Sequence, residues 1–442
     1  MRKGVFWVIF LILLTGMSVH APAQESDEEE DVVEVGKKYV VNLSLYYPIS
    51  INKSKHDEVN INLGLVYSHV GTVNGFDLAV LGSAVEHRLN GFQLCGLAGV
   101  VGESGTGVQI AGLATVAGES FTGLQASLLA NVVGETGTVL QVSGLANVVG
   151  DRGTVGQLCA LFNVAGEGFT GVQVAGGFNV GGGPSSGLQV VGLFNVVGEQ
   201  YEGIQVGGLF NVVGERLSGF QAVGLFNVAG DRCDGGQIAG LFNVTGDELR
   251  GFQVGSFNVA VHQKGLQVGV ANVSEYNHGV QIGLVNYCKE DNDGVPIGAV
   301  NIARNGRIKG IAWGGNGVAV TGGVRFEVGR YYSIVSLGLY NVEDRISESL
   351  SYGMHYGLTF PVGKLNLSPD IGYRYRDNTP LFKNPKDQRD QHMLEFRLSL
   401  RAPLSERMAL FAGSGLGHSF DAGANIDTGN TYPLIFAGIE FF

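Results

Sequence analysis

A motif that repeats with a fixed step of 16 residues occupies the middle of this chain and constrains its fold more than any other feature. Its fullest form reads Gly-x-Gln-Val-x-Gly-Leu-Phe-Asn-Val-Val-Gly-Glu. The glutamine of the motif recurs at Gln93, Gln109, Gln125, Gln141, Gln157, Gln173, Gln189, Gln205, Gln221, Gln237 and Gln253. The asparagine recurs six residues later at Asn131, Asn147, Asn163, Asn179, Asn195, Asn211, Asn227 and Asn243. A short fixed period indicates one structural unit that is copied and stacked.

Each copy is rich in Val, Phe and Leu, is punctuated by Gly and lacks a helical period, so it reads as β-strand. Counting irregular copies at both ends, about sixteen copies lie between residues 59 and 304. Two arrangements compete. Each copy could be one strand of a wide antiparallel barrel, or one coil of a parallel β-solenoid.

The spacing between Gln and Asn separates the two arrangements. In the last copies Asn258, Asn272 and Asn286 follow their glutamine by five residues instead of six. In one continuous strand this slip would turn each Asn to the opposite face, which in a membrane barrel is lipid. A solenoid tolerates the slip if Gln and Asn lie on separate strands joined by a corner. We therefore predict a solenoid over residues 59–310.

Stacked coils place identical side chains above one another. Amide side chains both donate and accept hydrogen bonds, so each column of amides can bond along the stack. The predicted structural ladders comprise Gln173, Gln189, Gln205, Gln221, Gln237, Asn163, Asn179, Asn195, Asn211, Asn227 and Asn243, with an aromatic ladder of Phe194, Phe210, Phe226 and Phe242.

An acid follows the turn glycine in most copies, for example Glu103, Glu119 and Glu215. A column of like charges is unfavourable, although solvent and salt weaken the repulsion at an exposed turn. Calcium needs six to eight oxygen ligands, and one acid in each coil does not supply them. We expect a solvated edge, with cation binding as the alternative, and we predict no metal or other cofactor.

Composition bounds the remaining possibilities. The chain has 442 residues, a net charge of -12 and only 15% charged residues, so nucleic acid is not an expected partner. Of its four cysteines, Cys95 and Cys159 occupy the same repeat position four copies apart. Coils stacked at strand spacing would separate them by roughly 19 Å, too far for a disulfide. They are expected to be small core residues.

The first residues read as a bacterial secretory signal peptide, predicted at 1–23. Arg2 and Lys3 precede a short apolar run, and Ala21-Pro22-Ala23 fits a cleavage site. Residues 24–36 are polar and acidic, and are expected to form a solvated linker.

From about residue 318 the repeat gives way to longer strands with alternating apolar and polar residues. Leu394, Phe396, Leu398 and Leu400, for example, alternate with polar neighbours. Such strands fit a transmembrane β-barrel. Seven strands are expected in 318–442, at about 319–329, 331–342, 350–362, 364–376, 391–402, 407–420 and 432–442. A first barrel strand at 37–50, where Tyr39 to Tyr47 alternate, would complete an eight-stranded barrel with the solenoid inserted after it.

An eight-stranded barrel has an interior that side chains just fill. The inward charged residues expected to pair there are Arg325, Glu327, Asp370, Arg374, Arg376, Glu395, Arg397 and Arg401. Short and long connections alternate between the strands, as periplasmic turns and outer loops do in outer-membrane proteins. With the solenoid as the first loop, this predicts that it is exposed at the cell surface.

The segments Gly265-Leu-Gln-Val-Gly-Val-Ala-Asn-Val273 and Gly279-Val-Gln-Ile-Gly-Leu-Val-Asn286 resemble the repeats of bacterial surface repeat-containing proteins, whose units read GLQxGLxNVAG. The resemblance covers about 240 residues and implies surface display with little chemistry. The terminal Phe442 resembles the signal that the outer-membrane barrel assembly machinery recognises, which makes that machinery an expected partner beside outer-membrane lipid.

No catalytic constellation stands out, because Gln and Asn are poor acids, bases and nucleophiles and the histidines are scattered. We therefore predict a non-enzymatic, surface-displayed structural or adhesive protein anchored in a bacterial outer membrane. Surface display would present the repeats to an extracellular protein or glycan ligand. The alternative is an outer-membrane channel in which the repeats form strands of a wide barrel.

Overall fold

The computed structural model describes residues 36–340, 350–376, 391–405, 407–421 and 429–441. The predicted signal peptide, nearly all of the acidic linker and Phe442 lie outside these residues. Two compact units, 1–214 and 215–442, divide the chain. Together they contain a parallel β-solenoid of about 17 turns and a closed eight-stranded antiparallel barrel, so the predicted fold class is confirmed. Among the described residues, no helix is long and apolar enough to cross a membrane.

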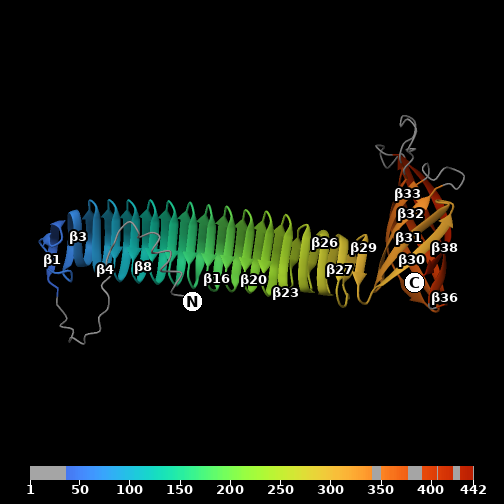
Figure 1. Ribbon diagram of the computed structural model, residues 1–442, viewed down its shortest axis with the longest axis horizontal. Coiled ribbons are helices and arrows are strands. Elements are labelled where there is room, and N and C mark those ends of the chain that lie inside the picture. The colour runs from blue at the N-terminus through green and yellow to red at the C-terminus, as the bar shows by residue number, and fades with distance from the viewer. Residues whose placement is uncertain (1–35, 341–349, 377–390, 406, 422–428, 442) are drawn as a thin grey trace. The chain divides into compact units, whose positions relative to one another are not determined.

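In the first unit, each regular coil consists of one longer and one shorter strand (Figure 1). The longer strands are β4 (Gly82–Cys95), β6 (Ser104–Ala111), β8 (Ser120–Ser127), β10 (Thr136–Ser143), β12 (Arg152–Cys159), β14 (Gly168–Ala175), β16 (Ser185–Val191) and β18 (Tyr201–Gly207). The shorter strands are β5 (Ala98–Val101), β7 (Ala114–Ala117), β9 (Ala130–Val133), β11 (Ala146–Val149), β13 (Phe162–Ala165), β15 (Phe178–Gly181), β17 (Phe194–Val197) and β19 (Phe210–Val213). Glutamine lies on each longer strand, and a corner separates it from the shorter strand. Asparagine lies on the shorter strands from β9 onward, whereas β5 and β7 carry Gly99 and Thr115 at that position.

The coils stack in parallel with a register of one repeat. Gln141 of β10 is paired with Gln157 of β12, and Asn147 of β11 with Asn163 of β13. This pairing overturns the alternative of a wide barrel, in which neighbouring repeats would be antiparallel. Most longer strands also bend at a glycine two residues before the glutamine. At Gly187, φ is +120° and an added Cβ would lie 1.9 Å from the carbonyl oxygen of Gly171, so only glycine fits this bend.

The N-terminal end of the first unit corrects the predicted domain organisation. β1 (Lys38–Tyr46), expected at 37–50 as a barrel strand, pairs in parallel with β3 (Glu58–Ala79) and forms the first coil, with the short β2 (Ile49–Ser50) beside it. Asn42 is fully buried and donates to Asn62 Oδ1 over 2.8 Å. Alternation of polar and apolar residues suits a barrel strand and a solenoid strand equally, which is why the prediction was wrong.

The second unit continues the same pattern with shorter coils before the barrel. Its solenoid strands are β20 (Arg216–Val223), β21 (Phe226–Ala229), β22 (Arg232–Ala239), β23 (Phe242–Leu249), β24 (Phe252–Val254), β25 (Phe257–Gln263), β26 (Leu266–Asn277), β27 (Val280–Cys288), β28 (Val295–Ile297) and β29 (Val300–Ala303). In the coil of β24 and β25 the glutamine strand loses one residue before its corner. The five-residue spacing from Gln253 to Asn258 follows from this loss, and both amides still face inward.

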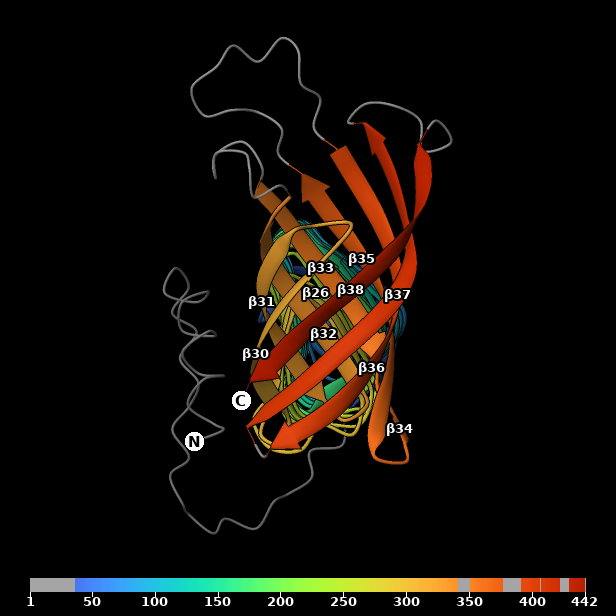
Figure 2. The same ribbon diagram turned by 90° about the vertical axis from the view of Figure 1, so that its right-hand side faces the viewer.

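The barrel begins where the solenoid ends. Its strands are β30 (Arg307–Gly315), β31 (Val320–Val328), β32 (Tyr331–Leu339), β33 (Leu350–Leu358), β35 (Leu365–Arg376), β36 (Gln391–Ser405), β37 (Met408–Asp421) and β38 (Asn430–Phe441), with the short β34 (Phe360–Val362) against β35 (Figure 2). β30 pairs with both β31 and β38 and so closes the barrel. The eighth strand is therefore β30, and the solenoid precedes the barrel instead of being inserted into it. Sequence patterning missed β30 because its inward positions include Ile311 and Trp313, which blur the alternation.

Amide ladders and the apolar outer face

The amide side chains of the repeat are buried in the solenoid core. The Gln and Asn side chains are 0–2% exposed, and they donate within the solenoid, except that Asn301 also donates to the barrel. Gln157 Nε2, for example, donates to Gln141 Oε1 of the preceding coil over 2.7 Å. Asn163 Nδ2 donates to Asn179 Oδ1 over 2.9 Å and to the backbone oxygen of Val174 over 2.9 Å. Satisfied networks of this kind allow polar groups to form a core, because no donor is left without a partner.

The two ladders have opposite directions. Within the first unit each Gln donates toward the N-terminus, as from Gln109 to Gln93 over 2.8 Å, whereas each Asn donates toward the C-terminus, as from Asn131 to Asn147 over 2.9 Å. The second unit repeats both directions: Gln281 donates to Gln267, and Asn272 to Asn286. The predicted ladder residues thus form hydrogen-bonded columns, while the phenylalanines stack outside them. Phe194 and Phe210 have ring centroids 4.7 Å apart and an interplanar angle of 3°.

The N-terminal end of the glutamine ladder is a buried acid. Asp77 occupies the glutamine position, accepts 2.8 Å from Gln93 Nε2 and 2.6 Å from Asn62 Nδ2, and is fully buried. Burial disfavours the charged form and raises the pKa of the Asp77 carboxyl, against the lowering effect of its hydrogen bonds from Ser83, Gln93 and Asn62. A carboxylate can only accept, so it suits the end of a ladder toward which every N–H points.

The outer surface of the solenoid is apolar where the core is polar. The positions just before and after each Gln, the corner, and the positions on either side of each Asn carry no Asp, Glu, Lys or Arg in any coil from Gln93 to Pro296. Corner leucines and valines are the most regular members, and each is more than a third exposed: Leu81, Leu97, Leu113, Leu129, Leu145, Leu161, Leu193 and Leu209 in the first unit, and Leu225, Leu241, Val270 and Leu284 in the second. We call this surface the apolar face. The uncharged columns that make up this face are present in the sequence, and they are the signal that could have predicted it.

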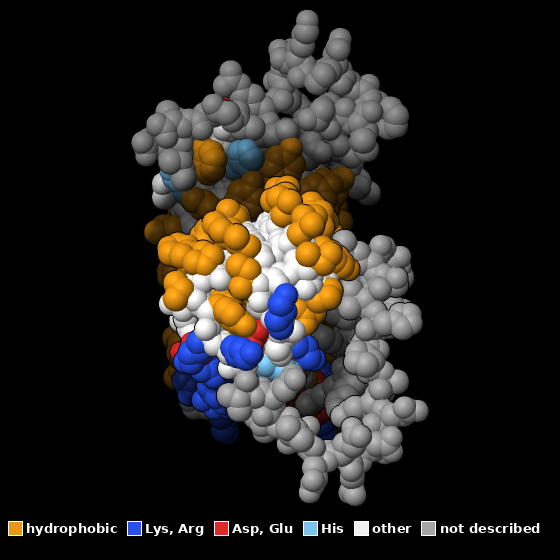
Figure 3. Space-filling view, turned by 90° about the vertical axis from the view of Figure 1, so that its left-hand side faces the viewer, with side chains coloured by type: hydrophobic (Ala, Val, Ile, Leu, Met, Phe, Trp, Pro, Cys, Tyr) orange, Lys and Arg blue, Asp and Glu red, His pale blue; other side chains and the backbone are white. Residues whose placement is uncertain are grey.

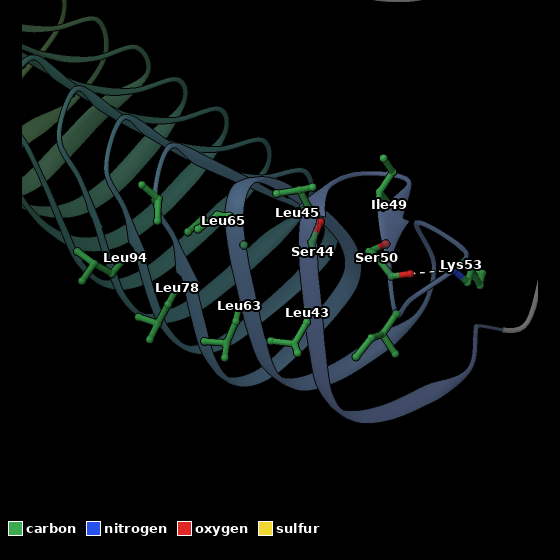
Figure 4. Close-up of a pocket in the computed structure, with 14 residues that line it drawn as sticks. Leu43, Ser44, Leu45, Ile49, Ser50, Lys53, Leu63, Leu65, Leu78 and Leu94 are labelled. Atoms are coloured by element: carbon green, nitrogen blue, oxygen red, sulfur yellow. Dashed lines mark hydrogen bonds between the residues drawn. The ribbon is translucent and has the colours of Figure 1, made fainter.

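At the N-terminal end the apolar face becomes a groove (Figure 4). Leu43, Leu63, Leu78 and Leu94 form a column along it, and Leu45 and Leu65 lie at its corner side. Lys53 lies at its end and donates to the Ser50 carbonyl oxygen over 2.8 Å. Figure 3 shows hydrophobic side chains over the upper part of this end and Lys and Arg side chains over the lower part. Apolar and charged groups are therefore segregated around the coil.

Charges gather on the opposite side of most coils. The acidic turn residues, such as Glu119 and Glu135, are exposed, and the adjoining stretch of the longer strand carries further charges. There Glu248 lies within ion-pair distance of Arg250, Lys264 and Arg232, and the hydrogen bond from Arg250 contributes most to lowering its pKa to about 2. No group of three or more His, Cys, Asp or Glu in the described residues is arranged to hold a metal ion.

The four cysteines are free and buried, and Cys159 packs with Ala175 and Val191 in the core.

Some of the histidines that are scattered in sequence lie together in the structure. His56 Nδ1 lies 2.9 Å from His87 Nε2, and His87 Nδ1 lies 2.8 Å from Glu103 Oε1. This contact joins coils that are far apart in sequence, so spacing alone did not reveal it.

Paired charges fill the barrel interior. Arg397 forms a bidentate pair with Asp370 at 2.8 and 3.1 Å, and Arg374 pairs with Glu395 at 2.9 Å. Lys309, which sequence analysis missed together with its strand, contacts Glu327 and lies 3.0 Å from Glu440. Other predicted inward residues also have partners: Arg325 and Arg401 contact Glu327, and Arg376 lies over the Tyr340 ring. An apolar layer of Ile311, Trp313, Tyr332, Ile334, Phe411 and Phe436 completes the filling.

The last solenoid coil contacts the outer wall of the barrel within the second unit. Asn301 Nδ2 donates to Ser333 Oγ over 3.1 Å, and that hydroxyl donates to the Ala299 carbonyl oxygen over 2.9 Å. Tyr356 Oη donates to the Pro296 carbonyl oxygen over 2.9 Å. The barrel wall thereby covers the end of the solenoid core that Pro296 and Asn301 would otherwise expose.

Comparisons with protein-family models, with curated proteins and with solved structures find no match to this chain. The function is therefore inferred from the ladders, the apolar face and the barrel interior.

Proposed function

We propose that this chain is a non-catalytic structural repeat protein of a bacterial outer membrane, in which the barrel is a closed anchor and the solenoid binds through its surface. The observation that supports the proposal is the separation of apolar and charged side chains between the outside and the inside of the barrel. The barrel is apolar outside, with Phe396 55% and Leu398 43% exposed, and its interior is occupied by paired charges. An apolar wall around a filled interior suits a membrane anchor better than a pore.

The solenoid supports a binding role and gives no support to catalysis. Its interior is made of amides that are already hydrogen-bonded to one another, as Gln157 and Gln141 are, and amides are poor acids, bases and nucleophiles. What varies from coil to coil lies on the outside. The parallel pairing of the repeats contradicts the wide-barrel channel, in which neighbouring repeats would pair antiparallel.

The prediction that the solenoid is displayed at the cell surface depended on its insertion between two barrel strands, and in the structure the solenoid precedes the barrel instead. In the structure the chain enters β30 at Arg307, which pairs with Glu327 next to the tight turn at Gly329. The longer connections follow the strand ends at Leu339, Arg376 and Asp421, and these described strand ends lie at the opposite rim. Since short turns are periplasmic in outer-membrane barrels, we propose that the solenoid is periplasmic.

Protease treatment of cells tests the side directly. A periplasmic solenoid should be degraded only after the outer membrane is permeabilised, and a barrel fragment should survive. Release of solenoid fragments from intact cells would contradict the periplasmic side and favour the second candidate, a surface-displayed adhesive protein. That candidate keeps the support of the repeat resemblance at Gly265–Val273 and Gly279–Asn286.

The closed anchor is tested separately. Purified protein in a planar bilayer should show no steady conductance, because the charged pairs fill the barrel. A stable ion current from the wild-type chain would contradict the closed anchor and show that the small barrel itself conducts.

A further inference from the structure

We propose that the apolar face of the solenoid rests on the lipid leaflet at the short-turn side of the barrel, so that the repeat domain is itself a peripheral membrane element. This inference rests on the proposed function, because it needs the barrel to be in a membrane. It identifies the bound partner as phospholipid acyl chains at the leaflet surface.

The first reason is that the apolar face extends over many coils and contains no charged residue. Monomeric soluble proteins rarely expose continuous apolar patches larger than a few hundred Å². Here every coil from Gln93 to Pro296 keeps these positions uncharged, so each unit presents an apolar face. The corner residues reach 53% exposure at Val270 and 59% at Leu284. Amides inside and aliphatic side chains outside reverse the ordinary arrangement of a soluble protein.

The second reason is the distribution of charged residues around the coils. Acidic and basic residues occupy the turn after the asparagine strand and the first part of the longer strand, on the side away from the corner leucines. An element with one apolar and one charged side lies in an interface, with its apolar side about 5–10 Å into the headgroup region. A soluble protein partner would not require the face to be free of charge over its full length.

The third reason is the junction between the last solenoid coil and the barrel in the second unit, because it places the apolar corner on the lipid-facing side. The corner of the last coil, at Gly298 and Ala299, lies against Ser333 on the outer wall of β32, above the rim turn. The charged turn of that coil, from Arg304 to Gly306, leads directly into Arg307 at the rim. The apolar corner of this coil is therefore continuous with the barrel wall, whose outward residues further along β32 are Val335 and Leu337.

Trp substitutions in the full-length protein test the inference. The protein is reconstituted into phospholipid vesicles with brominated acyl chains, which quench nearby indoles. Leu193→Trp places the reporter on the apolar corner, Glu199→Trp places it on the charged turn that follows in the same coil, and Leu398→Trp places it on the barrel wall. The signal of the parent protein, which contains the buried Trp313, is subtracted.

We expect lipid to quench Leu193→Trp nearly as strongly as Leu398→Trp and several-fold more strongly than Glu199→Trp. Quenching at Leu398→Trp without quenching at Leu193→Trp would overturn this inference and leave the membrane anchor intact. Absence of quenching at all three positions would overturn the proposed function as well.

A second copy of the chain is the competing occupant of the face. It is examined with Leu193→Cys, a position at which the native side chain is about half exposed, in a chain whose own cysteines are buried. Oxidative cross-linking between two chains in vesicles, together with unquenched Leu193→Trp, would replace lipid by a second protein. Monomeric Leu193→Cys under the same conditions supports the leaflet.

Discussion

Asn301 and Ser333 join the asparagine ladder of the solenoid to the outer wall of the barrel, through a hydrogen bond of 3.1 Å from Nδ2 to Oγ. Asn301 also accepts 2.8 Å from Asn286, and Ser333 in turn donates to Ala299. A barrel hydroxyl thereby accepts the last amide hydrogen of a ladder whose donors all point the same way. Without this partner a fully buried donor would be left unsatisfied, at a cost of about 1–3 kcal/mol.

Ser333→Ala is expected to loosen this junction while leaving the barrel folded. The substitution removes only the hydroxyl and with it both hydrogen bonds, so the amides of β29 should exchange with deuterium faster. Amides of β36 and β37, on other strands of the barrel, serve as the control and should not change. Unchanged exchange in β29 would show that packing alone holds the last coil against the wall.

Gln141→Leu is expected to weaken the solenoid locally. It removes the ladder partners of Gln125 Oε1 and Gln157 Nε2, which lie 2.9 and 2.7 Å from their Gln141 partners in the core. Two unsatisfied amide groups cost about 2–5 kcal/mol. Faster hydrogen exchange should be concentrated in β8, β10 and β12, because each coil contacts only its neighbours.

Leu140→Ala is the matched control for Gln141→Leu, because the neighbouring Leu140 is on the same strand, faces outward and is 50% exposed. It should leave exchange almost unchanged. An equal effect from both substitutions would contradict an energetic role for the ladder and point to side-chain bulk instead.

Asp77→Asn is expected to reduce the pH dependence of solenoid stability. Because burial raises the pKa of Asp77 in the folded chain, its contribution to stability is fully present below the unfolded value of about 3.9 and is lost as pH rises through the folded pKa. The wild-type chain should therefore lose stability over that range, and the variant should lose less. Urea unfolding of detergent-solubilised protein at several pH values measures this, and parallel curves for the two proteins would count against the prediction.

Asp370→Asn is expected to destabilise the barrel strongly. Arg397 would retain its charge in a buried site after losing its bidentate partner, and Tyr332, which donates to Asp370 Oδ2 over 2.9 Å, would lose a charged acceptor. Breaking a buried pair on one side costs about 3–5 kcal/mol. Thermal unfolding in detergent should show a clearly lower midpoint, whereas Leu398→Ala on the exposed outer side of the barrel should lower it much less. Equal midpoints for Asp370→Asn and wild type would show that the interior is solvated and not a closed plug.

The repeat made most of the solenoid predictable. The 16-residue step placed Gln141 above Gln125, and the slip at Asn258 required a corner between the two amides. Both conclusions follow because coils that repeat in sequence must repeat in space. The closed barrel was also predictable from alternation along strands such as β36, since an apolar outer wall and a charged, filled interior impose opposite polarities on neighbouring residues.

The identity of the eighth barrel strand could not be read in the same way. Tyr39 to Tyr47 alternate as a barrel strand does, and Arg307 to Gly315 do not, yet β30 closes the barrel and β1 begins the solenoid. Alternation reports that two faces of a strand differ, and it does not report which neighbour the strand pairs with. That choice moved the solenoid to the short-turn rim and reversed the side on which it is proposed to lie.

The sequence by itself determined the stacking period, the amide core and an outer face without charge, because these are properties of single columns of residues. Only the tertiary structure decided which strands pair, in which direction each ladder donates, and where the ladders end, at Asp77 and Ser333. Those outcomes depend on contacts between residues far apart in the chain, such as Asn301 and Ser333, and a periodic pattern contains no information about where its two ends are covered.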